Sequence, residues 1–420
     1  MTKPTIDRRG LLAGLGLAST AASAAAGPRS SKPARPAFRK GLPDVVVIGA
    51  GAFGGWAALE LRERGYNVTL VDAYGPGNAF ASSAGETRNI RAGYGDRGIY
   101  SAWAAKAWVA WHERQEEFGR RLIYPSGSLR DPGPEQMAEQ VAVYEKLKLP
   151  YEMLTAEEVS RRWPQIRTDD LDRIFYDIHS GSVKAREASI AVAEAFERKG
   201  GKIILGRATP GAASAGRLES VMVNDEPLAA GQFVFACGPW LAKLFPEILG
   251  DKIIAHRAEL FFVGPAPDDT RYRWDNVPSI SDQITYTTAD IGGGYKIAAQ
   301  LSGVTLDPDE DERLPTPFLK KQVEGYVKRR LPGLVGRPVV QTYVGPADHT
   351  STGHYIFDRH PDWANALIAG GGSGHAFKMG PVLGVYAADR IAGLPQPAEY
   401  EAVFSLAAHC PVKQTRRDRG

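Results

Sequence analysis

Cysteine is scarce in this chain: only Cys237 and Cys410 occur among 420 residues. Two cysteines exclude both the crosslinked framework of a small disulfide-rich domain and a metal centre built from thiolates. The sequence leaves open whether the two thiols pair with each other. Packing of the apolar residues, which make up 43% of the chain, must therefore hold the fold together, and no metal site is predicted.

An excess of charge is also lacking. The formal net charge is +3, and residues 1–26 carry two of those charges. The remainder of the chain is close to neutral, so it generates no field that would attract nucleic acid or an anionic membrane. The apolar run near the N-terminus is short and rich in glycine and alanine, too weak for a membrane span. We therefore expect neither a nucleic-acid partner nor a permanent membrane anchor.

Residues 1–26 nevertheless follow an ordered pattern. Arg8 and Arg9 precede the mildly apolar run, and alanines 24–26 provide small residues for cleavage before Gly27. This order resembles a twin-arginine export signal and implies an exported, periplasmic protein. That route is known for carrying folded proteins, often with a cofactor inserted, so the resemblance also implies a tightly held cofactor. A basic tail without a transport role is the alternative.

The length of the chain predicts two domains, or one domain with a large insertion, because a single core rarely extends to 420 residues. Residues 27–43 are basic and rich in proline, which is typical of a flexible linker. The fold is therefore expected to begin at Asp44.

The fold is predicted to open with a glycine-rich turn between a strand and a helix. Residues 45–48 form a continuous apolar run, typical of a strand buried on both faces of a parallel sheet. Gly49, Gly51 and Gly54 then give the spacing G-x-G-x-x-G, and a helical pattern follows as far as Gly65. These glycines permit a tight turn, a close approach of pyrophosphate to the backbone, and close packing of helix on strand.

An acidic residue completes this nucleotide-binding pattern. A second apolar strand, 68–71, ends at Asp72, whose carboxylate can accept hydrogen bonds from ribose hydroxyls. The start of the helix provides free N–H groups for the phosphates. A chance glycine-rich turn is the alternative, but strand, helix, second strand and acid occur in register. This unit alone is compatible with NAD or FAD.

Short motifs farther along the chain carry a family resemblance. They are "VVVIGAGAFGG", "GETRNIRAGYG", "RRWPQI", "HSGSV", "FVFACGPWLAKL", "GGGYKIAAQLSG" and "FDRHPDWANALIAGGGSGHAFKMGP", in this order between residues 44 and 405. Together they resemble the sarcosine oxidase-like branch of the D-amino-acid-oxidase superfamily. Members of that branch are FAD enzymes that oxidise secondary and N-methyl amines.

The resemblance implies an α/β fold with two domains, a Rossmann-like FAD-binding domain and an antiparallel-sheet substrate domain that covers the flavin ring. The residues agree, since a helix and a strand are predicted within 187–205, a buried strand within 232–238, and alternating, aromatic-rich strands within 251–345. Residues 1–26 are expected to be the signal, 27–43 the linker and 406–420 a tail. The FAD-binding domain is expected to comprise residues 44–120, 185–250 and 346–405, and the substrate domain residues 121–184 and 251–345.

The resemblance also implies a set of cofactor contacts. They are expected at Gly49, Ala50, Gly51, Ala52, Phe53, Gly54, Asp72, Ala73, Thr87, Arg88, Ala236, Gly238, Trp240, Gly372, Gly374, His375, Phe377 and Lys378. Arg88 either lies against the flavin or supports its own loop, with Thr87 beside it. Relatives that hold FAD covalently use a cysteine where Gln341 stands here, so we expect FAD to be bound without a covalent link.

Two further matches concern catalysis. Lys296, in "GGGYKIAAQ", matches the lysine that lies above the flavin and activates dioxygen, because a fixed positive charge stabilises an anion forming in a poorly solvated pocket. The alternative is an edge-strand lysine with its amine in solvent. Tyr343 matches an active-site tyrosine that shapes the pocket and hydrogen-bonds the substrate; the alternative is an ordinary core aromatic residue.

Arg91 and Lys378 match the two cations that bind the substrate carboxylate in the amino-acid-oxidising relatives. An arginine fork suits a planar carboxylate, and a second cation fixes its orientation. The alternative for Arg91 is a surface ion pair with Glu86 or Asp96. The alternative for Lys378 is a solvent-facing position early in a helix.

Some positions depart from the family pattern. Ser83 and Ala84 replace histidines of close relatives, and so does Gln300, so the substrate need not be sarcosine. The segment 347–355, "ADHTSTGHY", is longer than in relatives and contains His349 and His354. We interpret it as a loop, because two histidines alone are a poor metal site.

These matches predict FAD-dependent oxidation of an N-substituted or cyclic amino acid, with hydride transfer to flavin, hydrolysis of the imine, and formation of hydrogen peroxide. The expected partners are a small amine or amino acid and molecular oxygen or another electron acceptor. One alternative is an exported dehydrogenase that passes electrons to a quinone or carrier. A flavin-binding accessory protein without amine turnover and an NAD-dependent dehydrogenase are the others.

Overall fold

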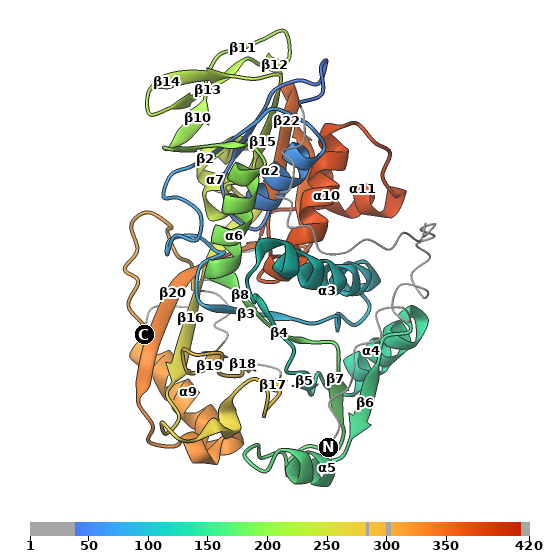
Figure 1. The fold of residues 1–420 in the computed structure, drawn as a ribbon, viewed down its shortest axis with the longest axis vertical. Coiled ribbons are helices and arrows are strands. Elements are labelled where there is room, and N and C mark those ends of the chain that lie inside the picture. The colour runs from blue at the N-terminus through green and yellow to red at the C-terminus, as the bar shows by residue number, and fades with distance from the viewer. Residues whose placement is uncertain (1–37, 283–284, 300–303, 413–420) are drawn as a thin grey trace, which may run out of the picture.

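The computed structural model describes residues 38–282, 285–299 and 304–412. The predicted export signal, most of the predicted linker, and Gln300 lie outside these residues. Within them, we find no helix whose length and apolar character would suit a membrane crossing. Two large sheets organise this part of the chain, and Figure 1 shows them in the upper and lower halves of the view.

The first sheet has six strands and is mostly parallel. Its order is β21-β22-β15-β1-β2-β9, and β21 runs antiparallel to β22. The strands span Val45–Ile48 (β1), Val68–Asp72 (β2), Lys202–Leu205 (β9), Gln232–Phe235 (β15), Ile356–His360 (β21) and Trp363–Gly370 (β22). The predictions of β1, β2, β9 and β15 are confirmed, so separated stretches of chain assemble one nucleotide-binding sheet.

Both faces of this sheet are covered because β1 is apolar on both faces. Val45 and Val47 belong to a core cluster shared with helices α2, α3, α6 and α10, whereas Val46 and Ile48 belong to a second cluster on the other face. These helices span Gly54–Glu63 (α2), Gly98–Phe118 (α3), Ala185–Arg198 (α6) and Gly380–Ile391 (α10). Alternation of side chains along a strand explains the division between the two clusters.

Helix α10 lies unusually close to α2. A Cβ atom added at Gly380 would stand 2.2 Å from Nε1 of Trp56, and one added at Gly384 would stand 2.6 Å from the Trp56 carbonyl oxygen. Because a side chain at either position would collide, these glycines allow α10 to pack against α2, the first helix beside the six-stranded sheet.

The second sheet has eight strands, in the order β20-β16-β19-β18-β17-β5-β7-β6. They span Ser128–Arg130 (β5), Tyr151–Leu154 (β6), Ile174–Asp177 (β7), Ile253–Val263 (β16), Ser279–Ser281 (β17), Thr285–Thr288 (β18), Tyr295–Ala299 (β19) and Val339–Thr350 (β20). The pairings of β16 with β19 and β20, and of β18 with β19, are antiparallel, as the alternating pattern predicts.

The register of this sheet decides which side chains share a face. Leu260 is paired with both Ala298 and Tyr343, and its neighbour two residues on, Phe262, is paired with Lys296. Directly paired residues point to the same side of an antiparallel sheet. Lys296 and Tyr343 therefore project from one face of the sheet, although 46 residues separate them along the chain.

The opposite face packs on helix α9 (Pro317–Arg330), where Phe261 and Ile297 join a core cluster with Leu319 and Val323. The remaining strands form small sheets: Thr87–Ile90 (β3), Gly181–Lys184 (β8) and Ile123–Tyr124 (β4); Ala208–Pro210 (β10), Ser220–Val223 (β13) and Glu226–Ala229 (β14); and Ala213–Ser214 (β11) with Arg217–Leu218 (β12). The other helices are Pro134–Leu147 (α4), Ala156–Arg162 (α5), Leu241–Leu244 (α7), Pro246–Leu249 (α8) and Ala398–Phe404 (α11).

The loop predicted for 347–355 is wrong in its first part. Strand β20 continues to Thr350, and its pairing with β16 extends to the pair Ile253 and Thr350. His349 therefore lies on a strand, while His354 follows the turn after it. The sequence of this stretch has no alternation of apolar and polar residues that would predict a strand. Its first part is extended because it pairs with the long neighbouring strand β16.

An ionic cluster joins the segment after β19 to the nucleotide-binding sheet. The carboxylate of Asp309 accepts hydrogen bonds from the Trp240 indole at 2.9 Å, from Arg207 at 3.1 Å and from Lys243 at 2.8 Å. Burial alone would raise the pKa of Asp309, but these three donors outweigh it and lower the pKa to about 2. The cluster is therefore fully charged near neutral pH and connects the two halves of the molecule.

Replacing Asp309 with Asn should lower the melting temperature by about 2 °C, since partly exposed ion pairs contribute about 1 kcal/mol together. The difference from the unmodified protein should shrink in 0.5 M salt because mobile ions screen surface charges. Asp169→Asn is the matched control, since Asp169 is 79% exposed and its ion pair with Arg167 is weak at a separation of 4.0 Å. Differential scanning calorimetry measures both variants, and an equal loss in Asp169→Asn would contradict a specific role for the cluster.

Candidate active site

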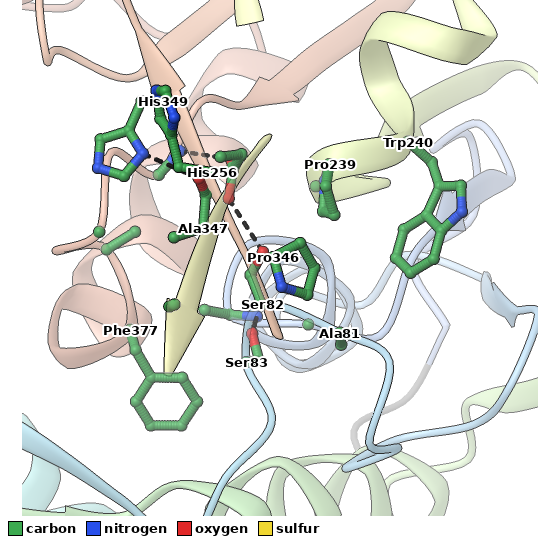
Figure 2. Close-up of a pocket in the computed structure, with 18 of the residues that line it drawn as sticks. Ala81, Ser82, Ser83, Pro239, Trp240, His256, Pro346, Ala347, His349 and Phe377 are labelled. Carbon is green, nitrogen blue, oxygen red and sulfur yellow. Dashed lines mark hydrogen bonds between the residues drawn. The ribbon is translucent and has the colours of Figure 1, made fainter. Parts of the chain in front are cut away.

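One cavity of about 1980 Å³ lies between the two large sheets. It exceeds the size of an ordinary small-molecule site, which is about 300–1,000 Å³, and so has room for a dinucleotide together with a second ligand. Figure 2 shows that side chains from distant parts of the chain line it, among them Ser83, Trp240, His256, Ala347 and Phe377.

Most residues predicted as functional lie in the wall of this cavity. They are Gly49, Gly51, Ala52, Phe53, Asp72, Ala73, Arg88, Arg91, Ala236, Gly238, Trp240, Tyr343, Gly372, Gly374, His375, Phe377 and Lys378. The fold thus brings together stretches that the resemblance could only list in order.

Four predicted residues lie behind the wall instead. The amide of Ala50 donates to Oδ2 of Asp72 at 2.7 Å, and Gly54 packs against Gly49 at the start of α2. The side chain of Thr87 shares a hydrogen bond of 3.0 Å with Thr288. The carbonyl of Thr87 accepts the amine of Lys296 at 2.8 Å. These residues shape the wall without forming its surface.

The glycine-rich turn fits the pyrophosphate of a dinucleotide. A Cβ atom at Gly49 would stand 2.3 Å from the Ala236 carbonyl oxygen, and one at Gly54 would stand 1.9 Å from the Gly49 carbonyl oxygen. No side chain caps the N-terminus of α2, whose N-cap residue is Phe53, so the positive end of the helix is left to a ligand. The residues present therefore fit FAD, with Asp72 at the position for the ribose.

Asp348 connects three segments of the cavity wall and was missed from the sequence. Its Oδ2 accepts the amide of Gly372 at 2.7 Å, and its Oδ1 accepts the hydroxyl of Ser82 at 3.1 Å. The neighbouring Ser83 accepts the amide of Ala52 at 2.9 Å. No sequence signal could have found Asp348, because its partners come from elements far apart in the chain.

Lys296 is fully buried, with 0% of its surface exposed. Its amine lies 2.8 Å from the carbonyl oxygen of Thr87 and 5.2 Å from the centre of the Tyr286 ring, which lines the cavity. Burial lowers the pKa of this amine well below its usual value, and the charge of Arg88 lowers it further. The alternative, an edge-strand lysine with its amine in solvent, is therefore wrong.

Arg88 holds its own loop together, which is one of the two roles expected for it. Its guanidinium donates to the carbonyl oxygens of Ser82 at 2.9 Å, of Thr87 at 3.0 Å and of Ala84. It supports the loop and also lines the cavity.

Arg91 and Lys378 converge on one tyrosine. The Arg91 guanidinium carbon is 5.1 Å from the centre of the Tyr94 ring, and the Lys378 amine is 5.3 Å from it. Lys378 is only 6% exposed, so it is not the solvent-facing residue of the alternative reading. Arg91 donates to the Gly93 carbonyl, and Glu86 faces Arg186 at 3.5 Å rather than Arg91.

Arg130 lies behind this group and adds to its charge. It donates to the Gly93 carbonyl at 2.7 Å, and burial, reinforced by the charge of Arg91, lowers its pKa to about 9. The nearby Asp177 accepts the hydroxyl of Tyr144 at 2.7 Å, and burial raises the pKa of its carboxyl. The charge of Asp177 raises the pKa of Arg130 and so offsets part of the effect of burial.

Five cations thus lie in or directly behind the cavity wall: Arg88, Arg91, Arg130, Lys296 and Lys378. In the part of the chain that the structure describes, no carboxylate comes within 4.0 Å of any of them, whereas lysines and arginines elsewhere pair repeatedly. Their donors are directed at neutral oxygens instead. A site of this kind attracts an anion.

Cys237 and Cys410 do not form a disulfide, which answers the question that the sequence left open. Cys237 lines the cavity, and burial raises the pKa of its thiol to about 12. The charge of Asp72 also raises it. Gln341 lies toward the edge of the sheet, with its side-chain oxygen 3.9 Å from a Cβ added at Gly293.

Tyr94 and Tyr286 are further cavity residues that were not singled out from the sequence. Tyr94 lies within the motif "GETRNIRAGYG", so the motif itself offered a signal. Tyr286 lies among threonines 285, 287 and 288, and its place beside Lys296 follows only from the pairing of β18 with β19.

Comparison with known proteins agrees with this site. Residues 44–390 match the family described as FAD dependent oxidoreductase (DAO). Monomeric sarcosine oxidase of Bacillus sp. (strain B-0618) is 26% identical over 356 residues, which cover 81% of this chain and 90% of that protein. N-methyl-L-tryptophan oxidase of Escherichia coli O139:H28 is 25% identical over 369 residues, covering 82% of this chain and 94% of that protein.

Solved structures show the same fold. The fructosamine oxidase Amadoriase II of Aspergillus fumigatus superposes with a TM-score of 0.75 at 19% identity, covering 87% of this chain and 90% of that one. L-proline dehydrogenase from P. horikoshii superposes with a TM-score of 0.74 at 21% identity, covering 87% and 96%. The predicted fold class and the sarcosine oxidase-like resemblance are confirmed.

Proposed function

We propose, from the premise that this chain belongs to the family of FAD-dependent oxidoreductases, that it oxidises the C–N bond of an N-methyl, otherwise secondary, or cyclic amino acid. Its similarity to proteins named sarcosine oxidase and N-methyl-L-tryptophan oxidase supports this substrate class. The amine is oxidised to an imine, which water hydrolyses, and two electrons with two protons reduce oxygen to hydrogen peroxide. Bound FAD supplies the acceptor for the hydride from the carbon beside nitrogen.

The group of cations without a carboxylate partner carries this proposal. A neutral amine alone would give no reason to place Arg91 beside the buried Lys378, whose charge loses its hydration. The carboxylate of a substrate would compensate for the lost hydration, and the two cations would fix its orientation. The proposed roles are therefore carboxylate binding for Arg91 and Lys378, and shaping of the pocket for Tyr343, whose hydroxyl donates to the Ala81 carbonyl at 2.9 Å.

Lys296 is proposed to favour the reduction of oxygen. Reduction creates negative charge in a cavity with little water, and a nearby cation lowers the energy of that charge. The amine is held by the Thr87 carbonyl, and Arg88 is close enough to lower its pKa. These two cations would act on the same region of the cavity.

One observation favours a dehydrogenase as the second candidate. The Lys296 amine is turned toward Thr87, and Lys296 does not itself line the cavity. If the amine stays there when FAD is bound, its influence on oxygen is weakened, and a quinone or carrier becomes the better acceptor.

FAD is proposed to be held without a covalent bond. The site of the family's cysteine is Gln341, and the cavity thiol of Cys237 has its pKa raised to about 12, which makes it a poor nucleophile. Precipitating the purified holoenzyme with acid should therefore release the yellow cofactor into the supernatant. Absorbance near the visible flavin bands in the pellet instead of the supernatant would show a covalent link.

Anaerobic stopped-flow mixing with N-methyl amino acids and with proline should bleach the flavin absorbance. A matched amine without the carboxylate should reduce the flavin at least about tenfold less efficiently, because hydrogen bonds to a charged group contribute about 1.5–3 kcal/mol. Substrate binding should weaken as pH rises, since burial and the charge of Arg91 lower the pKa of Lys378 and its charge is lost early. Failure of every amino acid to reduce the flavin would refute the substrate class.

Replacing Lys296 with Met should slow reoxidation of the reduced protein by oxygen by about 10²-fold, the usual cost of losing one preorganised electrostatic contact. Anaerobic flavin reduction should change far less, because the substrate binds elsewhere. Lys296→Arg retains the charge and is the matched control. Slow reoxidation of the unmodified protein, with no further change in Lys296→Met, would favour the dehydrogenase.

A further inference from the structure

Tyr94 occupies the space between the two cations proposed to bind the substrate carboxylate. Its hydroxyl oxygen accepts the Lys378 amine at 2.9 Å, a contact between residues 284 positions apart. Its ring faces both Lys378 and the Arg91 guanidinium, whose carbon is 5.1 Å from the ring centre. Tyr94 also lines the cavity, as Lys378 and Arg91 do.

The hydroxyl of Tyr94 retains a hydrogen that it can donate. A phenol has one donor and can accept as well, and the Lys378 amine uses an acceptor position. Burial raises the pKa of Tyr94 to about 12, which outweighs the opposing charges of Arg91, Arg130 and Arg97, so the group is protonated at neutral pH. Among residues 38–282, 285–299 and 304–412, no acceptor for this hydrogen is found.

Lys378 also keeps a donor for a ligand. Its amine donates to the Tyr94 hydroxyl and to the His375 carbonyl at 3.2 Å, which uses two of its three hydrogens. The His375 ring does not compete, because its Nε2 faces the Gly353 carbonyl at 3.0 Å and its Nδ1 faces the Tyr355 hydroxyl at 2.8 Å. Burial and the charge of Lys378 lower the pKa of that ring to about 3, so it is neutral.

We propose that Tyr94 is a third donor to the substrate carboxylate and makes the site selective for a carboxylate over an amide or ester. Its O–H, the free N–H of Lys378 and the fork of Arg91 would together meet the oxygens of one carboxylate. An amide offers a single carbonyl oxygen and an NH₂ group that would face the cations, so it would leave donors unpaired. This inference rests on the proposed function and adds a specificity-determining residue to it.

The test measures the binding of acetate to the oxidised holoenzyme through the shift of the flavin absorbance. Acetamide is the uncharged counterpart of acetate. Tyr94→Phe keeps the ring and removes only the hydroxyl. The dissociation constant for acetate should rise about tenfold or more, because the lost hydrogen bond is to a charged group. The preference for acetate over acetamide should fall with it, while the limiting rate of flavin reduction at saturating substrate changes less than the concentration needed for saturation.

Tyr74→Phe is the matched control. Tyr74 also lines the cavity, but its hydroxyl is bonded to Arg207 at 2.9 Å, beside Trp240 and away from Lys378. It should leave acetate binding unchanged. An equal weakening in both variants would overturn the proposal, because the effect would then not depend on the place of the hydroxyl.

Arg91→Lys separates this inference from the function on which it rests. Weak acetate binding in Arg91→Lys with normal binding in Tyr94→Phe would refute the role of Tyr94 and leave the proposed function standing. Failure of the unmodified holoenzyme to bind acetate would refute both. Should Tyr94→Phe not retain flavin, a crystal structure of the unmodified holoenzyme with acetate decides: an acetate oxygen within about 3.2 Å of the Tyr94 hydroxyl supports the proposal, and a longer separation overturns it.

Discussion

Buried or partly buried cations that have no carboxylate within 4.0 Å dominate the cavity between the two sheets in the described part of the chain. A lysine or arginine removed from water loses several kcal/mol of hydration unless other groups replace it. Here backbone carbonyls and hydroxyls replace it: Thr87 for Lys296, Ser82 for Arg88, Gly93 for Arg130, and Tyr94 for Lys378. Neutral oxygens solvate the cations but leave their net charge in place, so the cavity remains attractive to an anion.

This arrangement requires loops that present carbonyls inward, and two rigid sheets hold those loops. The strand β3 and the residues before it lie against the face of the large sheet that carries Lys296, Tyr286 and Tyr343. The carboxyl ends of the parallel strands provide the phosphate-binding turn on the other side, where ligands bind in folds of this kind. The cofactor and the substrate are therefore expected to meet where the two sheets face each other.

The cations near the cavity form two separate groups. Arg91, Tyr94 and Lys378 gather around one aromatic ring, whereas Lys296 and Arg88 lie near Tyr286. Under the proposed function, a change in the first group would alter the binding of the amino acid and leave the reaction with oxygen in place. The large cavity volume is consistent with variation in the substrate side chain among proteins that share the fold.

Elements with a local signal can be predicted from the amino-acid sequence alone. The apolar run 45–48, the three glycines and Asp72 predict a strand, turn, helix and second strand, because each conformation there depends on neighbouring residues. The motif order also predicted that Arg91, Lys378, Lys296 and Tyr343 belong to one site. Residue types and spacing carry that information without any coordinates.

The relative positions of those side chains depend on how the whole chain packs. Lys296 and Tyr343 share a face because of the register of three antiparallel strands, and a shift by one residue would have turned both away. The hydrogen bond between Tyr94 and Lys378 joins residues 284 positions apart. Asp348 joins Ser82 to Gly372, which lie in elements that no local sequence pattern relates. Such contacts depend on packing of the whole chain, since hydrogen bonds and charges act over a few ångströms in space whatever their distance along the sequence.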